Sequence, residues 1–506
     1  MNEHSIIQVC NSVVTRLNET FIQEPYIKDD ISDCNKSSIY LLRDCLRDTS
    51  RGEGSLVKAS SLVDYAREKL HTFPYKDVPL SWRRFHTDAT LVKGVCEIFL
   101  AINLFEEKGS WEQVIGTLDM TLIMTGAPGS GRREMIFELI EETRKILKKL
   151  DHNSTIVSSQ KIKTASKRVV DDDLFQNPID NKDYTKKVKS SPTEVITDTH
   201  SIPIINNPLS KVSQPSLTAF TSHVTLKDPT PFIITSSISH WPAFSTRPWN
   251  TDYLLDKIGR ERLVPVEIGA KYTDESWTQK IVNFGEFVER WIKNSDNENI
   301  AYLAQHDLFT QVPSLQDDVV VPDYCFVDTN SFVINLNRGN DNNDHSRNIR
   351  YTPPQNIITN AWFGPKGTIS PMHTDPYHNL LAQVVGRKYV RLYSPNETYK
   401  VYPFEKDGFL NNTSQVSAAC SRSAFFFCCM TRIFEANQTF IVVLNRMSKV
   451  EVENPNLDQF PLFATAQYKE CILEPGELLY IPPGWWHYVR SLSVSFSDNL
   501  SIVQIA

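Results

Sequence analysis

The stretch GTISPMHTDPYHN, Gly367–Asn379, decides how the C-terminal half of this sequence folds. It places His373 and Asp375 two residues apart in an HxD pair. Residues two apart on an extended strand project to the same face of a sheet, so both side chains can converge on one ion. An HxD pair alone is common, and the alternative interpretation is a pair of surface residues.

A second histidine lies far downstream, in PPGWWHYVR, where His487 follows a Pro-Pro-Gly turn and enters a predicted strand. Two histidines and one carboxylate on one side of a metal leave the opposite positions open. Non-haem Fe(II) oxygenases use this facial triad to bind 2-oxoglutarate and then dioxygen. The alternative is that His487 is a structural histidine at the end of a barrel.

Lys388 lies between the two parts of the triad, in the apolar strand QVVGRKYVRLYSP, Gln383–Pro395. A lysine in a buried strand is costly unless a negative group accompanies it. A bound dicarboxylate would supply that group. Without the triad, an exposed strand lysine is the simpler interpretation; beside the triad, we predict a carboxylate-binding lysine.

Short β-rich segments separated by Pro, Gly and Asn surround these motifs from about residue 201 onward. Such segments, rich in β-branched and aromatic residues, are typical of a sandwich or barrel. The predicted strands are Phe232–Thr235, Leu263–Ile268, Ile357–Trp362, Tyr389–Tyr393, Glu477–Ile481 and Ser491–Phe496.

The first 150 residues have a different pattern and are predicted to be helical. In Leu91–Asn103 apolar residues recur at helical spacing and mark one buried face. Residues 151–200 are polar, mixed in charge and poor in aromatics, so they cannot bury enough surface to offset the entropy of ordering. We predict a disordered linker there.

The overall composition excludes several classes of protein. A net charge of −7 and a pI near 6.0 provide no basic field, so we expect no direct nucleic-acid binding. The N-terminus lacks a signal-peptide pattern, and the longest apolar stretch is too short to cross a membrane. Nine cysteines without paired spacing are expected to be reduced thiols, which places the protein in the nucleus, the cytoplasm or both.

The segments around the triad resemble the JmjC-domain 2-oxoglutarate oxygenases over roughly residues 202–497. The matching blocks are HWPA at 240–243, VPVEIGAKYTDESW at 264–277, PDYC at 322–325, residues 360–395, NNTSQV at 411–416, VENPNLDQFPLF at 452–463 and residues 471–492. The resemblance implies an α+β protein with a C-terminal double-stranded β-helix, a cupin-like jelly roll, at 201–506. An N-terminal helical domain at 1–150 and the linker at 151–200 would precede it.

The resemblance also implies roles for individual residues. His373, Asp375 and His487 would be the iron ligands. Lys388 would bind the distal carboxylate of 2-oxoglutarate, and dioxygen would be the second co-substrate. The other residues expected in the 2-oxoglutarate pocket are Tyr324, Ser370, Asn379 and Trp362.

Two further residues in the matching blocks, Glu267 and Trp277, are candidates for holding an arginine side chain by a bidentate ion pair and stacking. The alternative is that Trp277 is a core residue and Glu267 lies on a surface strand. We therefore expect a hydroxylase acting on arginyl side chains of a protein or peptide. A demethylase acting on Nε-methyl-lysine, for example in histones, and a catalytically impaired binding protein or aberrant isoform are the alternatives.

Two segments depart from the family pattern. An apolar insert occupies residues 417–449, where the family continues almost directly, and the chain ends DNLSIVQIA from Asp498 where aromatic residues are expected. Both departures begin abruptly inside matching blocks. We therefore hypothesise that they are translated intron or mis-joined sequence. Sequencing the transcript across codons 410 to 455 tests this, and an uninterrupted coding sequence in abundant message would contradict it.

Overall fold

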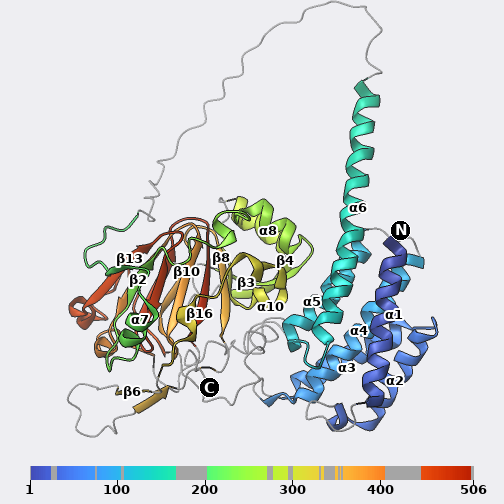
Figure 1. The fold of residues 1–506 in the computed structure, drawn as a ribbon, viewed down its shortest axis with the longest axis horizontal. Coiled ribbons are helices and arrows are strands. Elements are labelled where there is room, and N and C mark those ends of the chain that lie inside the picture. The colour runs from blue at the N-terminus through green and yellow to red at the C-terminus, as the bar shows by residue number, and fades with distance from the viewer. Residues whose placement is uncertain are drawn as a thin grey trace, which may run out of the picture.

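The computed structural model has a helical region and a β-sheet region that lie side by side (Figure 1). It describes residues 2–23, 31–73, 77–103, 108–166, 202–269, 277–294, 300–329, 332–335, 348–351, 354, 357–404 and 446–502.

The helical region is built from six helices in the described part of the chain. They are α1 (Asn2–Gln23), α2 (Lys36–Ser50), α3 (Leu56–His71), α4 (Leu80–Asn103), α5 (Lys108–Thr125) and α6 (Arg132–Ser166). Asn35 and Ser55 begin α2 and α3, because their side chains accept hydrogen bonds from the free amides of Ser38 and Lys58. Leu91, expected on a buried helical face, is fully buried in α4.

The long helix α6 continues past Asp151, where the composition predicted the start of a linker. Its first part packs Ile136, Leu139 and Ile140 into the helical core, whereas its far end projects away from both regions (Figure 1). Residues 167–200, the rest of the predicted linker, lie outside the described residues.

The β region contains two main sheets. One has the order β1-β2-β14-β10-β16-β8-β5-β3-β4, and the other has the order β12-β9-β15-β11-β13. The first comprises β1 (Lys211–Ser213), β2 (Phe232–Thr235), β14 (Leu478–Ile481), β10 (Asn379–Val385), β16 (Ser495–Ser501), β8 (Thr359–Gly364), β5 (Ala301–His306), β3 (Leu263–Ile268) and β4 (Thr278–Asn283). The second comprises β12 (Arg446–Met447), β9 (Ile369–Thr374), β15 (Trp486–Ser491), β11 (Lys388–Tyr393) and β13 (Tyr468–Leu473).

Smaller elements complete this region. They are the hairpin β6 (Phe332–Asn335) and β7 (Asn348–Tyr351) and the helices α7 (Leu217–Val224), α8 (Thr251–Ile258), α9 (Phe284–Phe287) and α10 (Leu308–Gln311). Apolar side chains of Ile233, Leu381, Leu479, Val390 and Leu392 pack between the two main sheets. Helices followed by a two-sheet, cupin-like β structure confirm the fold predicted from the sequence.

The two segments that depart from the family pattern both contribute strands. Residues 405–445, which include most of the insert, lie outside the described residues, but Met447 near the end of the insert pairs with His373 as part of β12. The described residues on either side of 405–445 lie next to each other, because the amide of Phe404 donates to the carbonyl of Met447 at 2.8 Å. The start of the C-terminal segment, Asp498–Ser501, belongs to β16, which pairs with both β10 and β8.

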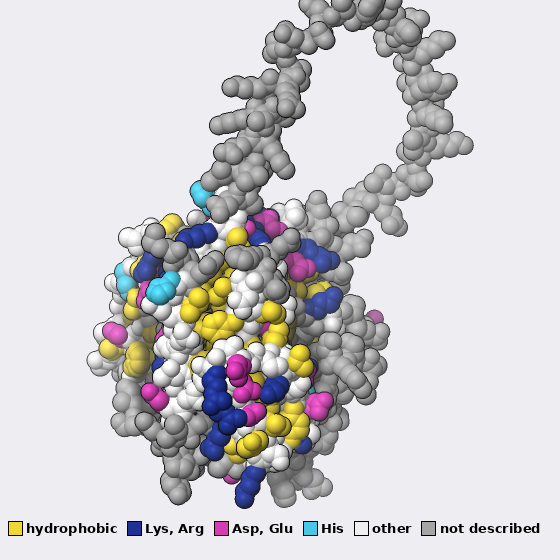
Figure 2. All heavy atoms as spheres, turned by 90° about the vertical axis from the view of Figure 1, so that its right-hand side faces the viewer, with side chains coloured by type: hydrophobic (Ala, Val, Ile, Leu, Met, Phe, Trp, Pro, Cys, Tyr) yellow, Lys and Arg dark blue, Asp and Glu magenta, His cyan; other side chains and the backbone are white. Residues whose placement is uncertain are grey.

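The helical region contacts the β region through α5 and α6. Arg144 of α6 donates to the carbonyls of Asp256 and Lys257 at the C-terminal end of α8, and it pairs with Glu261 at 2.8 Å. On the side of the molecule that the helices occupy, lysines and arginines lie beside acidic and hydrophobic side chains (Figure 2).

Candidate metal centre

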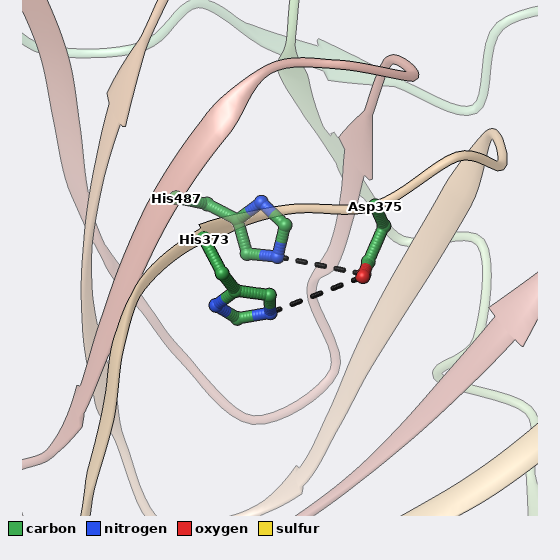
Figure 3. Close-up of side chains that lie close together, drawn as sticks. All are labelled: His373, Asp375 and His487. Carbon is green, nitrogen blue, oxygen red and sulfur yellow. Dashed lines mark ion pairs between the residues drawn. The ribbon is translucent and has the colours of Figure 1, made fainter. Parts of the chain in front are cut away.

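The triad predicted from the sequence comes together between neighbouring strands of the smaller sheet. His373 is near the end of β9, and His487 lies directly opposite it on β15. Asp375 follows β9 in the turn toward β10. Paired positions on adjacent strands project to the same face, so both imidazoles point toward the Asp375 carboxylate (Figure 3).

The distances within the triad suit a single ion. Nε2 of His487 lies 3.5 Å from Asp375 Oδ2, and Nε2 of His373 lies 4.0 Å from Oδ1. One donor atom from each residue lies within 4.8 Å of the other two. These separations leave room for an ion between the three donor atoms.

Backbone carbonyls fix the orientation of both imidazoles. Nδ1 of His373 lies 2.7 Å from the carbonyl oxygen of Pro371, and Nδ1 of His487 lies 3.0 Å from that of Trp485. A carbonyl can only accept, so each Nδ1 carries the proton and donates it. Each Nε2 therefore keeps a free lone pair that faces the other ligands, as metal-binding histidines require.

The protonation states also favour cation binding. Burial, with the neighbouring His487, lowers the pKa of His373 to about 4, so its imidazole is neutral. Burial alone would raise the pKa of Asp375, but the adjacent imidazoles of His487 and His373 and the hydrogen bond from Asn379 lower it overall. Nδ2 of Asn379 donates to Asp375 Oδ2 at 2.7 Å. Asn379, expected beside 2-oxoglutarate, thus holds the carboxylate ligand.

Lys388 begins β11, after a turn at Gly386 whose φ is +69°. A side chain at Gly386 would collide with the carbonyl of Val494. Lys388 is 1% exposed, and in the described parts of the chain it forms no ion pair. Its Nζ donates to the hydroxyl of Tyr302 at 3.2 Å, and burial lowers its pKa to about 7.

Tyr302 of β5 organises the pocket around Lys388. The Ser370 hydroxyl hydrogen-bonds to it, and the Trp362 ring lies 5.7 Å from it, centroid to centroid. The structure therefore brings together Lys388, Ser370 and Trp362, three of the residues expected to line the 2-oxoglutarate pocket.

Tyr324 lies elsewhere. It belongs to a short 3-10 helix, Asp323–Phe326, its hydroxyl donates to the carbonyl of Pro215 at 2.7 Å, and its ring packs on Phe220. The phenol beside Lys388 is therefore Tyr302 and not Tyr324. Tyr324 lies in the PDYC block that matches the family, whereas the strand pairing that brings Tyr302 inward has no local signal in the sequence.

Glu267 and Trp277 lie on the edge of the larger sheet that leads to this pocket. Glu267 on β3 is directly opposite Tyr302 on β5 and Gln279 on β4, and Trp277 immediately precedes β4. Burial raises the pKa of Glu267 to about 7, against the opposing effect of Trp277 and Gln279. No lysine or arginine of the described segments pairs with this carboxylate, and the indole N–H of Trp277 meets no acceptor in hydrogen-bond geometry.

Comparison with known proteins decides the family. A model of the cupin-like domain family matches residues 218–503. The chain is 35% identical over 459 residues to lysine-specific demethylase 8 of Danio rerio, which covers 90% of each chain. The chain belongs to the JmjC oxygenases.

Other relatives agree with this assignment. Lysine-specific demethylase JMJ30 of Arabidopsis thaliana is 31% identical over 446 residues, 88% of this chain and 85% of that protein. JmjC domain-containing protein D of Dictyostelium discoideum is 39% identical over 287 residues, 56% of this chain and 53% of that protein. The first of these relatives also aligns across the helical region.

JmjC oxygenases use Fe(II) and 2-oxoglutarate, and the donor set of this JmjC domain fits that metal. Two imidazoles and one carboxylate, on one side of a shared space, are the ligands that non-haem iron takes. Within the described residues of this JmjC oxygenase, no helix has the length and apolar character needed to cross a membrane.

Proposed function

We propose that this chain is an Fe(II)- and 2-oxoglutarate-dependent protein hydroxylase that acts on arginyl side chains. The observation that carries the proposal is the half-buried Glu267 carboxylate beside Trp277, which has no cationic partner among the described residues. A guanidinium group offers a planar, bidentate partner for a carboxylate and stacks on an indole. An arginine of a protein or peptide substrate would complete this site.

His373, Asp375 and His487 would hold the iron, which with 2-oxoglutarate and dioxygen supplies the oxidant for inserting oxygen into a C–H bond. The residues of the chain do the positioning. Asn379 keeps the Asp375 carboxylate turned toward the ion. Lys388 and Tyr302 receive the distal carboxylate of 2-oxoglutarate, with Ser370 and Trp362 beside them.

The pairing of β3 with β5 places the proposed arginine site beside the proposed 2-oxoglutarate pocket. Glu267 and Tyr302 are directly paired, so a side chain bound at Glu267 lies next to the co-substrate pocket. A buried ion pair of this kind positions the arginyl carbon close to the oxidant and excludes water from it.

The names of the relatives from Danio rerio and Arabidopsis thaliana favour a second candidate, an Nε-methyl-lysine demethylase. In that case the aromatic rings of Trp277, Tyr302 and Trp362 would face the methylated ammonium group. Histones would be candidate substrates, and the protein would act in the nucleus, the cytoplasm or both.

The experiment that separates the two functions is mass spectrometry of arginyl and methyl-lysyl peptides after incubation with the protein, Fe(II), ascorbate and 2-oxoglutarate. One added oxygen on arginine supports the hydroxylase, and loss of a methyl group from lysine supports the demethylase. His373→Ala is the inactive control. Absence of any product and of succinate with the unaltered chain would contradict both functions.

Glu267→Gln tests the arginine site separately from the metal site. Removing the charge of the binding carboxylate should raise the KM for an arginyl peptide by about 10- to 100-fold, the usual loss for a charge-assisted pair. Peptide-independent formation of succinate should stay within about twofold, since Lys388 and the triad are unchanged. Glu286→Gln, on the exposed side of α9, is the matched control and should leave both rates unchanged.

A further inference from the structure

A buried carboxylate of the helical region reaches into the β region. Asp119 of α5 is fully buried, and its Oδ1 and Oδ2 accept from Nη2 and Nε of Arg262 at 2.7 and 2.8 Å. Its Oδ2 also accepts from the backbone amide of Leu263, the first residue of β3, at 2.9 Å. The Asp119 side chain therefore binds both the side chain of Arg262, which precedes β3, and the backbone amide of Leu263, at which β3 begins.

A second residue of the β region strengthens this contact. Gln311, at the end of α10, donates to Asp119 Oδ1 at 3.0 Å and to the carbonyl of Leu263 at 2.8 Å. Its side-chain amide oxygen, Oε1, accepts from Nε2 of His306 on β5 at 2.6 Å. The start of β3 and the end of β5 are thus connected to the same carboxylate of α5.

The packing between α5 and the start of β3 is incomplete. Met120 and Met124 of α5 contact Leu263 and Ile281, but a cavity of about 460 Å³ opens beside them. Lys93 of α4 lies in its wall. Since apolar packing covers only part of the junction, the polar contacts of Asp119 set the position of β3 against the helices.

The strand held by Asp119 carries a residue of the proposed substrate site. Leu263 is the first residue of β3 and Glu267 is the fifth, with no loop between them. Glu267 in turn pairs with Gln279 and Tyr302 on the neighbouring strands. A shift at the start of β3 is therefore transmitted along one strand to the carboxylate, and a displacement of about 1 Å at such a site can cost a hundredfold in rate.

We propose that Asp119 is a positioning residue for the substrate site, and that the helical region takes part in the reaction by fixing β3 through it. This inference rests on the proposed function, because it assigns substrate binding to Glu267. It adds that substrate binding depends on a residue of α5 that touches neither substrate nor iron.

The test is Asp119→Asn in the full-length chain, compared with Asp88→Asn. Asp88 is an equally buried carboxylate that pairs with Arg132 at 3.0 Å, but both partners belong to the helical region. Each variant removes the charge of one buried carboxylate, and only Asp119→Asn touches the β region. Asp88→Asn therefore measures the effect of loosening the helices alone.

Two readouts are measured. Amide hydrogen exchange across residues 263–268 and 278–283, followed by mass spectrometry, should accelerate about tenfold or more in Asp119→Asn and less than about twofold in Asp88→Asn. The KM for the arginyl peptide should rise about 5- to 20-fold in Asp119→Asn, while kcat and iron content stay within about twofold. Gln311→Met, which keeps the ion pair, should show a smaller effect in the same direction.

The outcomes separate the inference from the proposed function. Unchanged exchange in β3 and β4, or equal effects of Asp119→Asn and Asp88→Asn, would overturn the inference even if arginine is hydroxylated. If Asp119→Asn does not fold, Gln311→Met decides, and unchanged exchange and KM in that variant would also overturn it. If amide exchange accelerates as expected in Asp119→Asn but the unaltered chain never oxidises arginine, only the proposed function is contradicted.

Discussion

Two regions of this molecule bury charged side chains, and they treat those charges in opposite ways. At the junction between the helices and the β region, Asp119 and Arg262 are 0% and 4% exposed as side chains, and they satisfy each other. In the site, Lys388 is equally buried but has only the neutral hydroxyl of Tyr302 as a partner among the described residues. Glu267 likewise has no cation there.

The difference distinguishes charges that hold the fold together from charges that await a ligand. In a buried pair that is fully hydrogen-bonded, each charge is compensated by its partner, so removing one partner is strongly destabilising. A buried lone charge is destabilising, so its pKa moves toward neutrality until a ligand arrives. The pKa values near 7 at Lys388 and Glu267 follow from this difference.

The largest expected effect follows from breaking the satisfied pair. Asp119→Ala leaves the Arg262 guanidinium buried without a counter-charge, and we expect a loss of about 3–5 kcal/mol in the free energy of unfolding. Urea denaturation of the iron-free chain measures it. A loss below about 1 kcal/mol would mean that water or a rearranged side chain can replace Asp119. The Asp119–Arg262 pair would then not be what holds the two regions together.

Removing the unpaired charge of Lys388 should stabilise the ligand-free chain, the opposite of the effect at Asp119. Lys388→Met should raise the free energy of unfolding of the ligand-free chain at pH 7 or below, by up to a few kcal/mol, because the cost of burying an ammonium disappears. The same change should weaken 2-oxoglutarate binding about a hundredfold. Thermal unfolding with and without 2-oxoglutarate measures both. A destabilised Lys388→Met variant would show that the lysine has a structural partner.

The pH dependence sharpens the contrast. The pKa of Lys388 is lowered from 10.5 to about 7, so between these values the unfolded chain binds one more proton than the folded one. The contribution of Lys388 to the stability of the ligand-free chain therefore rises as pH rises from about 7 to 10.5. Binding of 2-oxoglutarate requires the ammonium and should weaken over the same range, by up to about tenfold per pH unit.

Titration calorimetry of 2-oxoglutarate at several pH values, with Mn(II) in the metal site, checks this prediction. Lys388→Arg, which keeps its charge throughout, is the matched comparison and should bind with little dependence on pH. An affinity of the unaltered chain that stays constant from pH 7 to 9 would contradict the assignment of Lys388 as the carboxylate partner.

The smallest effect is expected at an exposed pair of the same junction. Lys148 and Asp256 lie 2.7 Å apart but are 59% and 73% exposed as side chains. Lys148→Gln should change the free energy of unfolding by less than about 0.5 kcal/mol, since solvent screens such pairs. A loss comparable to that of Asp119→Ala would mean that proximity of opposite charges, and not burial, holds the junction.

Local sequence patterns were enough to predict the fold and the centre of the site. The HxD spacing predicted that His373 and Asp375 converge on one ion, and the turn before His487 predicted that this histidine enters a strand. The structure places His373 near the end of β9, Asp375 directly after it and His487 on the neighbouring strand β15. The two-sheet architecture followed from short β-rich segments, and the helical region from the apolar spacing of α4. These features depend on periodicity and turn residues, which a single sequence contains.

Features that depend on pairing between distant segments could not be predicted. Tyr302 is 86 residues from Lys388 along the chain, and the pairing of β5 with β8 and β3 brings it inward. Asp119 and Arg262, 143 residues apart, have no sequence pattern that marks them as partners. The C-terminal segment departs from the family pattern, but Leu500 alternates with polar neighbours in β16 and is 1% exposed.

The way the insert joins the barrel lets this chain tolerate changes in the length and sequence of residues 405–445. Because Phe404 and Met447 are hydrogen-bonded to each other, the two ends of the intervening segment are already closed by the sheet itself. The entropy of closing a loop grows only with the logarithm of its length, about 0.6 kcal/mol for each doubling. Splicing or recombination could therefore lengthen, shorten or replace residues 405–445 while His373, paired with Met447, keeps its place.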